Sequence, residues 1–297
     1  MSHTKEAKSI LYKHKKRDSW FLSQYSVNAF EGCSCNCLYC YVRGSKYGLN
    51  MDDGLAIKTN ALELLDKQLR NRAKKSQFEF VAVGTATDAY MHHEEKWNLT
   101  SGMLQLLHKH RFPVFLSTKC LLIRRDIELL KAINNYAILP PDLGKVLSHG
   151  LIVSVSISTL DESISNMLEA GAATPSQRLA LISEFKAHGL LAGVNAMPLL
   201  PFISDTTEEM GKIIIAAKQA GADYILTGGL TLFGKEAGDG KTLYYQFLQR
   251  YRPELLPKYE QLYGSEFHTS FAYQKELRQR AAMLCKKHSI RNSILPV

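Results

Sequence analysis

Four cysteines within eight residues constrain this chain more than any other feature of its sequence. The stretch NAFEGCSCNCLYCYVRG at residues 28–44 places Cys33, Cys37 and Cys40 in the spacing C-x3-C-x2-C, with Cys35 between the first two. Small secreted domains use such cysteines in disulfides, but a chain of 297 residues can bury a core without them. The spacing therefore predicts a metal site on one short loop, and the fold has to hold that loop in place.

Apolar segments of strand length alternate with amphipathic helical segments along most of the chain. Strands are expected at residues 26–30, 78–85, 113–118, 151–158, 190–197 and 223–229. Helices are expected at residues 62–75, 99–110, 125–135, 176–189 and 206–221. Such alternation predicts parallel strands joined by right-handed crossovers. Because six units are fewer than the eight of a closed barrel, we predict an α/β fold built as an open, partial barrel.

The same pattern divides the chain into three parts. Residues 1–25 form a basic N-terminal arm, residues 26–229 form the barrel core, and residues 230–297 form a helical C-terminal extension that is rich in tyrosine. No linker, repeat or low-complexity segment separates these parts, so we expect one domain. The tyrosines of the extension are expected to pack in its core, with stacking on nucleobases as the alternative.

The net charge of +9 is concentrated at the two ends of the chain. Residues 1–25 contain six basic and two acidic side chains, and residues 270–297 contain six basic and one acidic side chain. Basic segments attract polyanions, so a nucleic acid is one candidate partner. The same charges would also keep a protein in solution without such a role, and both interpretations stay open.

The overall composition is that of an ordinary globular protein. Hydrophobic residues make up 45% and charged residues 22% of the chain, which excludes general disorder. No apolar run approaches the roughly 20 residues that span a bilayer, and the N-terminus lacks the apolar core of a signal peptide. We therefore expect a soluble, cytoplasmic protein with no membrane partner.

The cysteine loop permits two kinds of metal centre. Three thiolates can hold three corners of a cubane iron–sulfur cluster and leave one iron open. A structural zinc site needs four ligands, and Cys35 could supply the fourth. However, only one residue separates Cys35 from Cys33 and from Cys37. Neighbouring cysteine ligands of zinc are usually separated by about two to four residues. The spacing favours the cluster, with Cys35 as an unliganded loop residue.

With Tyr39 before the last cysteine, the motif reads C-x3-C-x-aromatic-C and resembles the signature of the radical S-adenosylmethionine (radical SAM) superfamily. The resemblance implies a partial (β/α)6 barrel of the TIM type and a 4Fe–4S cluster on Cys33, Cys37 and Cys40. It also implies that S-adenosylmethionine binds the open iron and is cleaved reductively to a 5′-deoxyadenosyl radical, which abstracts a substrate hydrogen atom. A low-potential electron donor of flavodoxin or ferredoxin type would then be a partner.

Further motifs resemble the spore photoproduct lyase-like group of that superfamily. They are NAFEGC (28–33), GTATDAYMHHEEKWNLT (84–100), STKC (117–120), VSISTLDESISNMLEAGAATPSQRL (155–179) and MPLLPFISD (197–205). By position, the resemblance implies that Lys119 and Ser156 contact the cofactor carboxylate and that Thr87 binds its amino-acid end. Ser158 could exchange roles with Ser156, since both face one side of a strand. Tyr39 would pack on adenine or the cluster, and Met197 would line the adenine side.

The chain also departs from the group. Thr85 stands where the lyase has the cysteine that returns a hydrogen atom to the substrate radical, so splitting of spore DNA dimers is not expected. Cys120, directly after Lys119, is an alternative hydrogen-atom donor, although a buried structural thiol is the simpler interpretation. His92, His93, Glu94 and Glu95 are interpreted as a solvated loop over the barrel mouth. The rival to an enzyme on nucleic acid is a non-catalytic nucleic-acid-binding protein stapled by zinc or a cluster.

Overall fold

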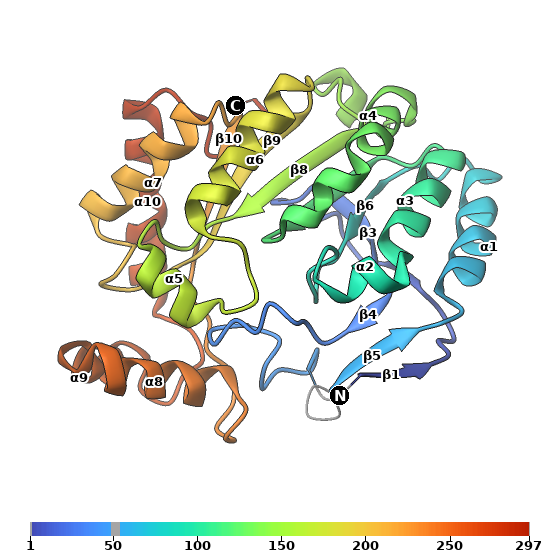
Figure 1. Cartoon of the computed structure of the whole chain (residues 1–297). Coiled ribbons are helices and arrows are strands. Elements are labelled where there is room, and N and C mark those ends of the chain that lie inside the picture. Colours follow the sequence, from blue (N-terminus) through green and yellow to red (C-terminus); the bar gives the residue numbers. More distant parts are fainter. Residues whose placement is uncertain (1, 49–53, 297) are drawn as a thin grey trace.

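A seven-stranded sheet in the order β10-β9-β8-β7-β6-β3-β2 forms the centre of the computed structural model, which describes residues 2–48 and 54–296 (Figure 1). Each neighbouring pair of strands is parallel except β2 (Leu11–Lys13), which runs antiparallel to β3. The parallel strands are β3 (Ser23–Val27), β6 (Phe80–Val83), β7 (Val114–Thr118), β8 (Leu151–Ser156), β9 (Leu191–Leu199) and β10 (Tyr224–Gly229). The six predicted strands are confirmed, although the first begins at Ser23 and not at Ser26.

Helices connect the parallel strands and cover the outer face of the sheet (Figure 1). The long ones are α1 (Ala61–Ala73), α3 (Leu99–Lys109), α4 (Ile127–Tyr136), α6 (Pro175–Ala187) and α7 (Thr207–Gln219). The short ones are α2 (His93–Trp97), η1 (Leu121–Asp126), η2 (Leu143–Lys145) and α5 (Glu162–Leu168). The prediction of a partial α/β barrel is confirmed. Within the described ranges, no helix has the length and apolar character to cross a membrane.

Residues of one strand alternate between two apolar cores. In β7, Val114 and Leu116 pack in the core beneath the helices, whereas Phe115 packs in a smaller core inside the barrel. The inner core also contains Tyr224 from β10 and Ile294 from the C-terminal segment. Because side chains of a strand point alternately to its two faces, the sheet is buried on both sides, and the barrel interior below its mouth is filled.

The N-terminal residues pair with the barrel and with a second, small sheet. β1 (Ser2–Lys5) pairs with β5 (Leu55–Lys58), which also pairs with β4 (Phe30–Glu31), just before the first cysteine. Lys13 lies opposite Tyr25, the central residue of β3, and the next amide, that of His14, donates to the Gln24 carbonyl. Further along, Arg17 forms ion pairs with Glu79 and Asp142. Residues 13–17 therefore lie toward the end of the barrel that is opposite the carboxyl ends of the strands.

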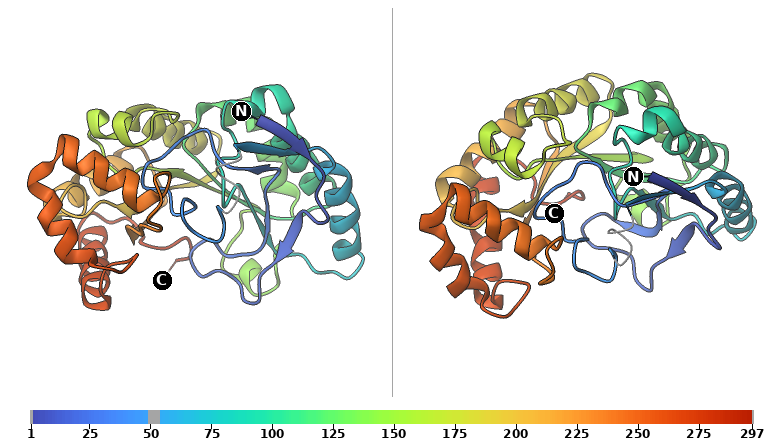
Figure 2. Two further views of the ribbon diagram at one scale, coloured as in Figure 1. Left: turned by 90° about the horizontal axis from the view of Figure 1, so that it is seen from below. Right: turned by 60° about the horizontal axis from the view of Figure 1, so that its bottom comes forward.

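The predicted helical extension is present after β10. It comprises α8 (Gly240–Tyr251), η3 (Pro253–Leu255), α9 (Leu256–Tyr263) and α10 (Phe271–Lys287), and Figure 2 shows α8 and α9 beside the mouth of the barrel. Its tyrosines fasten it to barrel loops: the Tyr259 hydroxyl donates to the Pro201 carbonyl at 2.7 Å, and the Tyr263 hydroxyl to the Leu230 carbonyl at 2.8 Å. Both side chains are buried, so they pack in the core, as expected.

The Tyr224 ring fits against Gly193 of the neighbouring strand, which generates a stability prediction. A β-carbon at Gly193 would lie 2.5 Å from a ring carbon of Tyr224, whose hydroxyl is held by the Val153 carbonyl at 2.9 Å. The ring cannot retreat without losing that bond. We expect Gly193→Ala to lower the free energy of unfolding by about 1–3 kcal/mol, as overpacking of a core does, measured by urea denaturation.

Gly211 in α7 provides the matched control. A β-carbon there would meet nothing within 4 Å, so Gly211→Ala should raise the free energy of unfolding by about 0.4–1 kcal/mol through the loss of unfolded-state entropy. Equal stabilities of the two variants would contradict the packing of Tyr224 described above.

Candidate active site

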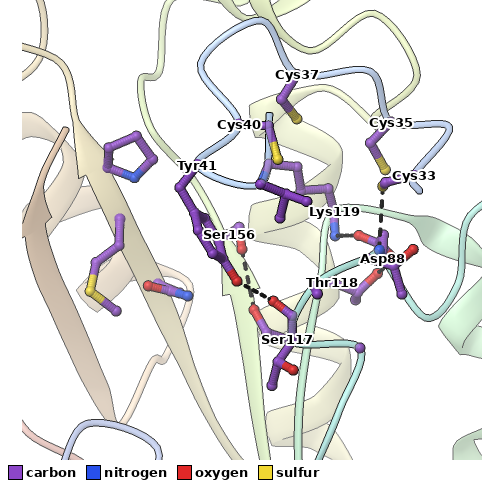
Figure 3. Close-up of a pocket in the computed structure, with 18 of the residues that line it drawn as sticks. Cys33, Cys35, Cys37, Cys40, Tyr41, Asp88, Ser117, Thr118, Lys119 and Ser156 are labelled. Carbon is purple, nitrogen blue, oxygen red and sulfur yellow. Dashed lines mark hydrogen bonds between the residues drawn. The ribbon is translucent and has the colours of Figure 1, made fainter. Parts of the chain in front are cut away.

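A cavity of about 380 Å³ lies at the carboxyl ends of the parallel strands, where α/β barrels bind their ligands. This volume is within the range of small-molecule sites. Figure 3 shows the cysteine loop on one side of the cavity and strand-end side chains on the other. The lining includes Phe21, Cys33, Cys35, Cys37, Tyr39, Cys40, Tyr41, Thr85, Thr87, Asp88, Phe115, Ser117, Lys119, Ser156, Asn195, Met197 and Thr231.

Backbone hydrogen bonds hold the cysteine loop on its support. The amide of Leu38 donates to the Leu168 carbonyl at 2.9 Å, and the amide of Gly171 donates to the Cys35 carbonyl at 3.1 Å. The segment 168–173 thus runs along the loop, and it also reaches β7 through the amide of Ala173, which donates to the Lys119 carbonyl at 3.0 Å. We call residues 168–173 the support segment.

Gly171 allows the closest approach between the support segment and the cysteine loop. A β-carbon at this position would lie 2.1 Å from the carbonyl oxygen of Ser34 and 2.9 Å from the α-carbon of Cys35. Both are backbone atoms, so no side-chain rotation could relieve the contact. The loop can lie where it does only because residue 171 is glycine.

Cys33, Cys37 and Cys40 all line the cavity, and none forms a disulfide. Burial raises the pKa of the Cys37 and Cys40 thiols, and the charge of Lys119 lowers the pKa of Cys37. A neighbouring thiol, Cys35, and burial raise the pKa of Cys33. Three such thiols, which line one cavity without a disulfide partner, favour the thiolate form only when a metal binds them. This donor set fits three corners of an iron–sulfur cluster.

Asp88 and Lys119 connect the cysteine loop to the strand ends. The Asp88 amide donates to the Cys33 sulfur at 3.3 Å, and its carboxylate accepts from the Thr118 hydroxyl and the Lys119 amide, both at 2.7 Å. Within the described part of the chain, the Lys119 ammonium has no hydrogen-bond or ion-pair partner, and it lines the cavity. Asp88 therefore fixes the strand end, and Lys119 is left to meet an anionic ligand.

Cys35, Cys120 and Asp88 form a second group of potential metal ligands, with their ligand atoms within 4.8 Å of one another. The sulfurs of Cys35 and Cys120 are 3.5 Å apart and buried. However, the two carboxylate oxygens of Asp88 already accept three hydrogen bonds, from Tyr90, Thr118 and Lys119. This group is a packing contact between the cysteine loop and β7, and it lacks the four ligands of a closed zinc site.

The remaining residues proposed from the resemblance differ in whether their polar groups are already bonded to the protein. Ser156 and Met197 line the cavity, and Ser156 lies 3.2 Å from the Ser117 hydroxyl. Thr87 also lines the cavity, but its hydroxyl donates to the Gly32 carbonyl at 2.6 Å. Ser158 is tied to the Tyr39 hydroxyl at 2.8 Å, so Ser156 and not Ser158 faces the cavity.

Asn195 is a cavity residue that the sequence did not single out. It lies next to Ser156 in the register of β8 and β9, and its buried side-chain oxygen has no hydrogen-bond partner among residues 2–48 and 54–296. Buried polar atoms are nearly always satisfied, so this oxygen marks a place for a ligand donor. One signal was available: Asn195 is the polar residue within the apolar strand sequence LLAGVNAM.

The interpretation of residues 92–95 as a solvated loop is wrong for Glu94 and for the helix that begins at His93, whereas His92 and Glu95 are exposed. Glu94 is completely buried in α2, where its carboxylate accepts from the amides of Thr100 and Ser101 and pairs with Arg125. It therefore caps the start of α3, because a carboxylate there satisfies amides that lack helical partners. The buried Glu94 stabilises the loop after β6, one wall of the cavity.

Comparisons with known proteins agree with this site. Residues 27–214 match the family model of the radical SAM superfamily. The chain is 31% identical over 273 residues to the uncharacterized proteins Rv2578c of Mycobacterium tuberculosis and Mb2609c of Mycobacterium bovis, a match that covers 90% of this chain and 75% of theirs.

Solved structures with a similar fold include variants of spore photoproduct lyase. One variant has a TM-score of 0.67 at 14% identity, over 97% of this chain and 79% of that chain. Another, with bound AdoMet and dinucleoside spore photoproduct, has a TM-score of 0.64 at 15% identity, over 92% of this chain and 76% of that chain. At such identities the likeness shows a common fold. The family match spans well over half of the chain, including the cysteine loop and the strand ends around the cavity, so the chain belongs to the radical SAM superfamily.

Proposed function

We propose that this radical SAM enzyme binds its 4Fe–4S cluster through Cys33, Cys37 and Cys40 and its S-adenosylmethionine beside Lys119. The observation that supports this assignment is the convergence of three unpaired thiols and one unpartnered ammonium on a single cavity. Members of the superfamily use these two cofactors, and the donor set of the loop fits the cluster. When bound, the cluster supplies the electron that splits S-adenosylmethionine to the radical that takes a hydrogen atom from the substrate.

The residues of the chain would position the cofactor and exclude water. Lys119 would pair with the carboxylate of S-adenosylmethionine as a compact charge. Ser117, Ser156 and Asn195, on three neighbouring strands, would offer hydroxyl and amide groups to its polar atoms. Phe21 and Phe115, stacked with ring centroids 4.5 Å apart, line the apolar part of the cavity. A largely apolar cavity favours radical transfer to the substrate over side reactions.

The contacts of Cys35 favour the cluster over a closed zinc site. The Cys35 sulfur lies 3.5 Å from Cys120, a residue of the strand end, so it is engaged away from a four-cysteine centre. A non-catalytic protein that uses zinc or a cluster only for stability would give no reason why the Asn195 oxygen and the Lys119 ammonium lack partners among the described residues. A cofactor bound at an open position of a cluster would supply partners for both groups.

A nucleic acid is our proposed substrate. Its support is the common fold with spore photoproduct lyase, which has been solved with a dinucleoside photoproduct. Dimer splitting by the lyase route is not proposed, since Thr85 replaces the donor cysteine and Cys120 is buried outside the cavity lining. Basic residues 13–17 lie toward the opposite end of the barrel, so they would bind phosphates only at a distance from the cavity.

The proposed partner in electron transfer is a low-potential donor of flavodoxin or ferredoxin type. The proposed location is the cytoplasm, because free thiols such as the six cysteines here persist in a reducing compartment.

Replacement of one proposed ligand tests the cluster assignment. We expect Cys37→Ala to lose most of the iron and all reductant-dependent 5′-deoxyadenosine, because two thiolates cannot hold a cubane cluster that needs three. Iron content and 5′-deoxyadenosine are measured after anaerobic reconstitution, with an expected value of about four irons in the unchanged protein.

Two other cysteines serve as controls for this experiment. Cys285→Ala removes a buried thiol of α10 and should leave iron and cofactor cleavage unchanged. Cys35→Ala should also retain the cluster, and loss of the metal in that variant, with zinc bound in the unchanged protein, would support the closed zinc site. Production of 5′-deoxyadenosine by Cys37→Ala would refute the ligand assignment.

Replacement of Lys119 tests the cofactor position. We expect Lys119→Met to weaken S-adenosylmethionine binding by about 10- to 100-fold, since a hydrogen bond to a charged group contributes about 1.5–3 kcal/mol. Binding to the reconstituted protein is measured by calorimetry. Lys212→Met, in an exposed ion pair of α7, should bind the cofactor as the unchanged protein does. Equal affinities of the two variants would place the carboxylate elsewhere.

Replacement of Gly171 tests the support of the cysteine loop. Because a methyl group there would meet the Ser34 carbonyl, we expect Gly171→Ala to shift the loop and to retain less than half of the iron of the unchanged protein. Gly211→Ala, which meets no atom, is the control, and iron content is the measurement. Full iron occupancy of Gly171→Ala would show that the loop tolerates another position.

A substrate labelled with deuterium tests the nucleic-acid proposal. Short single- and double-stranded oligonucleotides with deuterated sugars and bases are incubated with reconstituted enzyme, reductant and S-adenosylmethionine. Transfer of deuterium into 5′-deoxyadenosine is the expected result, detected by mass spectrometry. Cofactor cleavage without any deuterium transfer from this set would contradict a nucleic-acid substrate and leave the radical SAM chemistry intact.

A further inference from the structure

The Arg178 guanidinium is the largest fully buried polar group among the described residues, and it lies behind the cavity wall. Its exposed fraction is 0%, although it carries a full charge. It donates to the Ser156 carbonyl at 2.6 Å and to the Ser165 hydroxyl at 2.9 Å, and it forms an ion pair with Glu169. A buried charge is costly unless it is paired and hydrogen-bonded, and these contacts meet both conditions.

Glu169 places the negative partner of this ion pair beside the cysteine loop. Glu169 directly follows α5 and belongs to the support segment, whose backbone is hydrogen-bonded to the cysteine loop. Its carboxylate accepts hydrogen bonds from Arg178, from Ser165 at 3.2 Å and from the Tyr39 hydroxyl. Because Arg178 balances its charge, the carboxylate can stay ionised in a position that water does not reach.

Tyr39 carries the contact into the cysteine loop itself. It lies between Cys37 and Cys40 in the sequence, and its ring is buried. Its hydroxyl contacts both Glu169 and the Ser158 hydroxyl. The expected role of Tyr39, packing on adenine or the cluster, leaves this buried hydrogen bond unexplained.

Hydrogen bonds orient the ion pair relative to the cysteine loop. The Glu169 carboxylate accepts from the Tyr39 hydroxyl, which belongs to the loop, whereas the Arg178 guanidinium donates to the Ser156 carbonyl at 2.6 Å, at the end of β8. The negative end of the ion pair therefore lies beside the cysteine loop. Charges interact more strongly in such a buried environment than in water.

We propose that the buried Arg178–Glu169 ion pair, acting through Tyr39, is a positioning device that sets the reduction potential of the cluster held by the cysteine loop. The inference rests on the proposed cluster ligands. The Glu169 carboxylate would oppose the addition of an electron to a cluster held by the loop, and the Tyr39 hydroxyl would reduce this repulsion because it donates a hydrogen bond to the carboxylate. Protein levers of this kind, charge and hydrogen bonding close to the cluster, tune iron–sulfur potentials.

Two substitutions are predicted to shift the potential in opposite directions. Glu169→Gln keeps the size of the side chain and removes its negative charge, so the reduction potential of the cluster should become more positive. Tyr39→Phe keeps the ring and removes the hydroxyl, so the carboxylate is left less neutralised and the potential should become more negative. A purely structural role would loosen the loop in both variants and would not give shifts of opposite sign.

The experiment is a redox titration of the anaerobically reconstituted proteins, followed by electron paramagnetic resonance of the reduced cluster. Iron content is measured first, and only proteins with the cluster are titrated. Tyr244→Phe is the matched control, since it removes a buried hydroxyl, paired with Tyr259 at 3.0 Å in the extension, far along the chain from the cysteines. Its potential should equal that of the unchanged protein.

The outcomes separate the inference from the proposed function. A protein that binds no cluster in its unchanged form would refute the proposed function. A cluster of normal iron content whose potential is unchanged in Tyr39→Phe and Glu169→Gln, or moves in one direction in both, would refute the inference alone. Should Glu169→Gln fail to fold, the negative shift of Tyr39→Phe relative to Tyr244→Phe decides, because Tyr39→Phe leaves the ion pair in place.

Discussion

The active site depends on one constraint: three thiols must be held close together on a loop that has no regular structure of its own. Disulfides would serve that purpose in a small secreted domain, but here the thiols must stay available. The chain meets the constraint with backbone hydrogen bonds from Leu38 to Leu168 and from Gly171 to Cys35, and with one from the Asp88 amide to the Cys33 sulfur. Leu168, Gly171 and Asp88 belong to segments that follow β8 and β6, so the sheet positions the loop. The position of the cysteine loop therefore depends on the register of strands that lie outside it.

The sequence predicts the core of this fold well because burial leaves a periodic pattern. The six parallel strands are short apolar runs, and the helices between them show apolar residues three and four apart, so both periods are visible without any alignment. The small sheet of β1, β4 and β5 was missed. Its strands have two to four residues, and β1 is mostly exposed, so alternation over so few positions carries no signal. The early start of β3 was missed for a related reason, because Ser23 is buried but polar.

The site was predictable only in part. The spacing of Cys33, Cys37 and Cys40 defines the loop by itself, whereas Lys119 was expected only through the resemblance of the STKC segment to the lyase-like group. By contrast, the roles of Glu94, Glu169 and Arg178 depend on contacts between segments that are far apart in sequence, such as the bond from Arg178 to the carbonyl of Ser156. A charged residue in a helix is usually solvated, so no local rule indicates that Arg178 is completely buried. Asn195 shows the same limit: its position in an apolar strand signals something unusual, but only the structure shows that it lines the cavity and that its buried oxygen has no partner among the described residues.

The distribution of charge bears on how a large substrate would approach. The basic N-terminal residues contribute much of the net charge, yet Lys13 pairs in register with Tyr25 of β3, and Arg17 is engaged by Glu79 and Asp142. Attraction by those residues would bring a polyanion to the end of the barrel away from the cavity, where side chains of the inner core block passage through the barrel. A nucleic acid that reaches the cavity must therefore be guided mainly by groups at the mouth, where Arg43 and Lys46 follow the last cysteine of the loop. Long-range charge can raise the rate of encounter, so charged groups at the mouth would matter more for such a substrate than the basic residues at the opposite end.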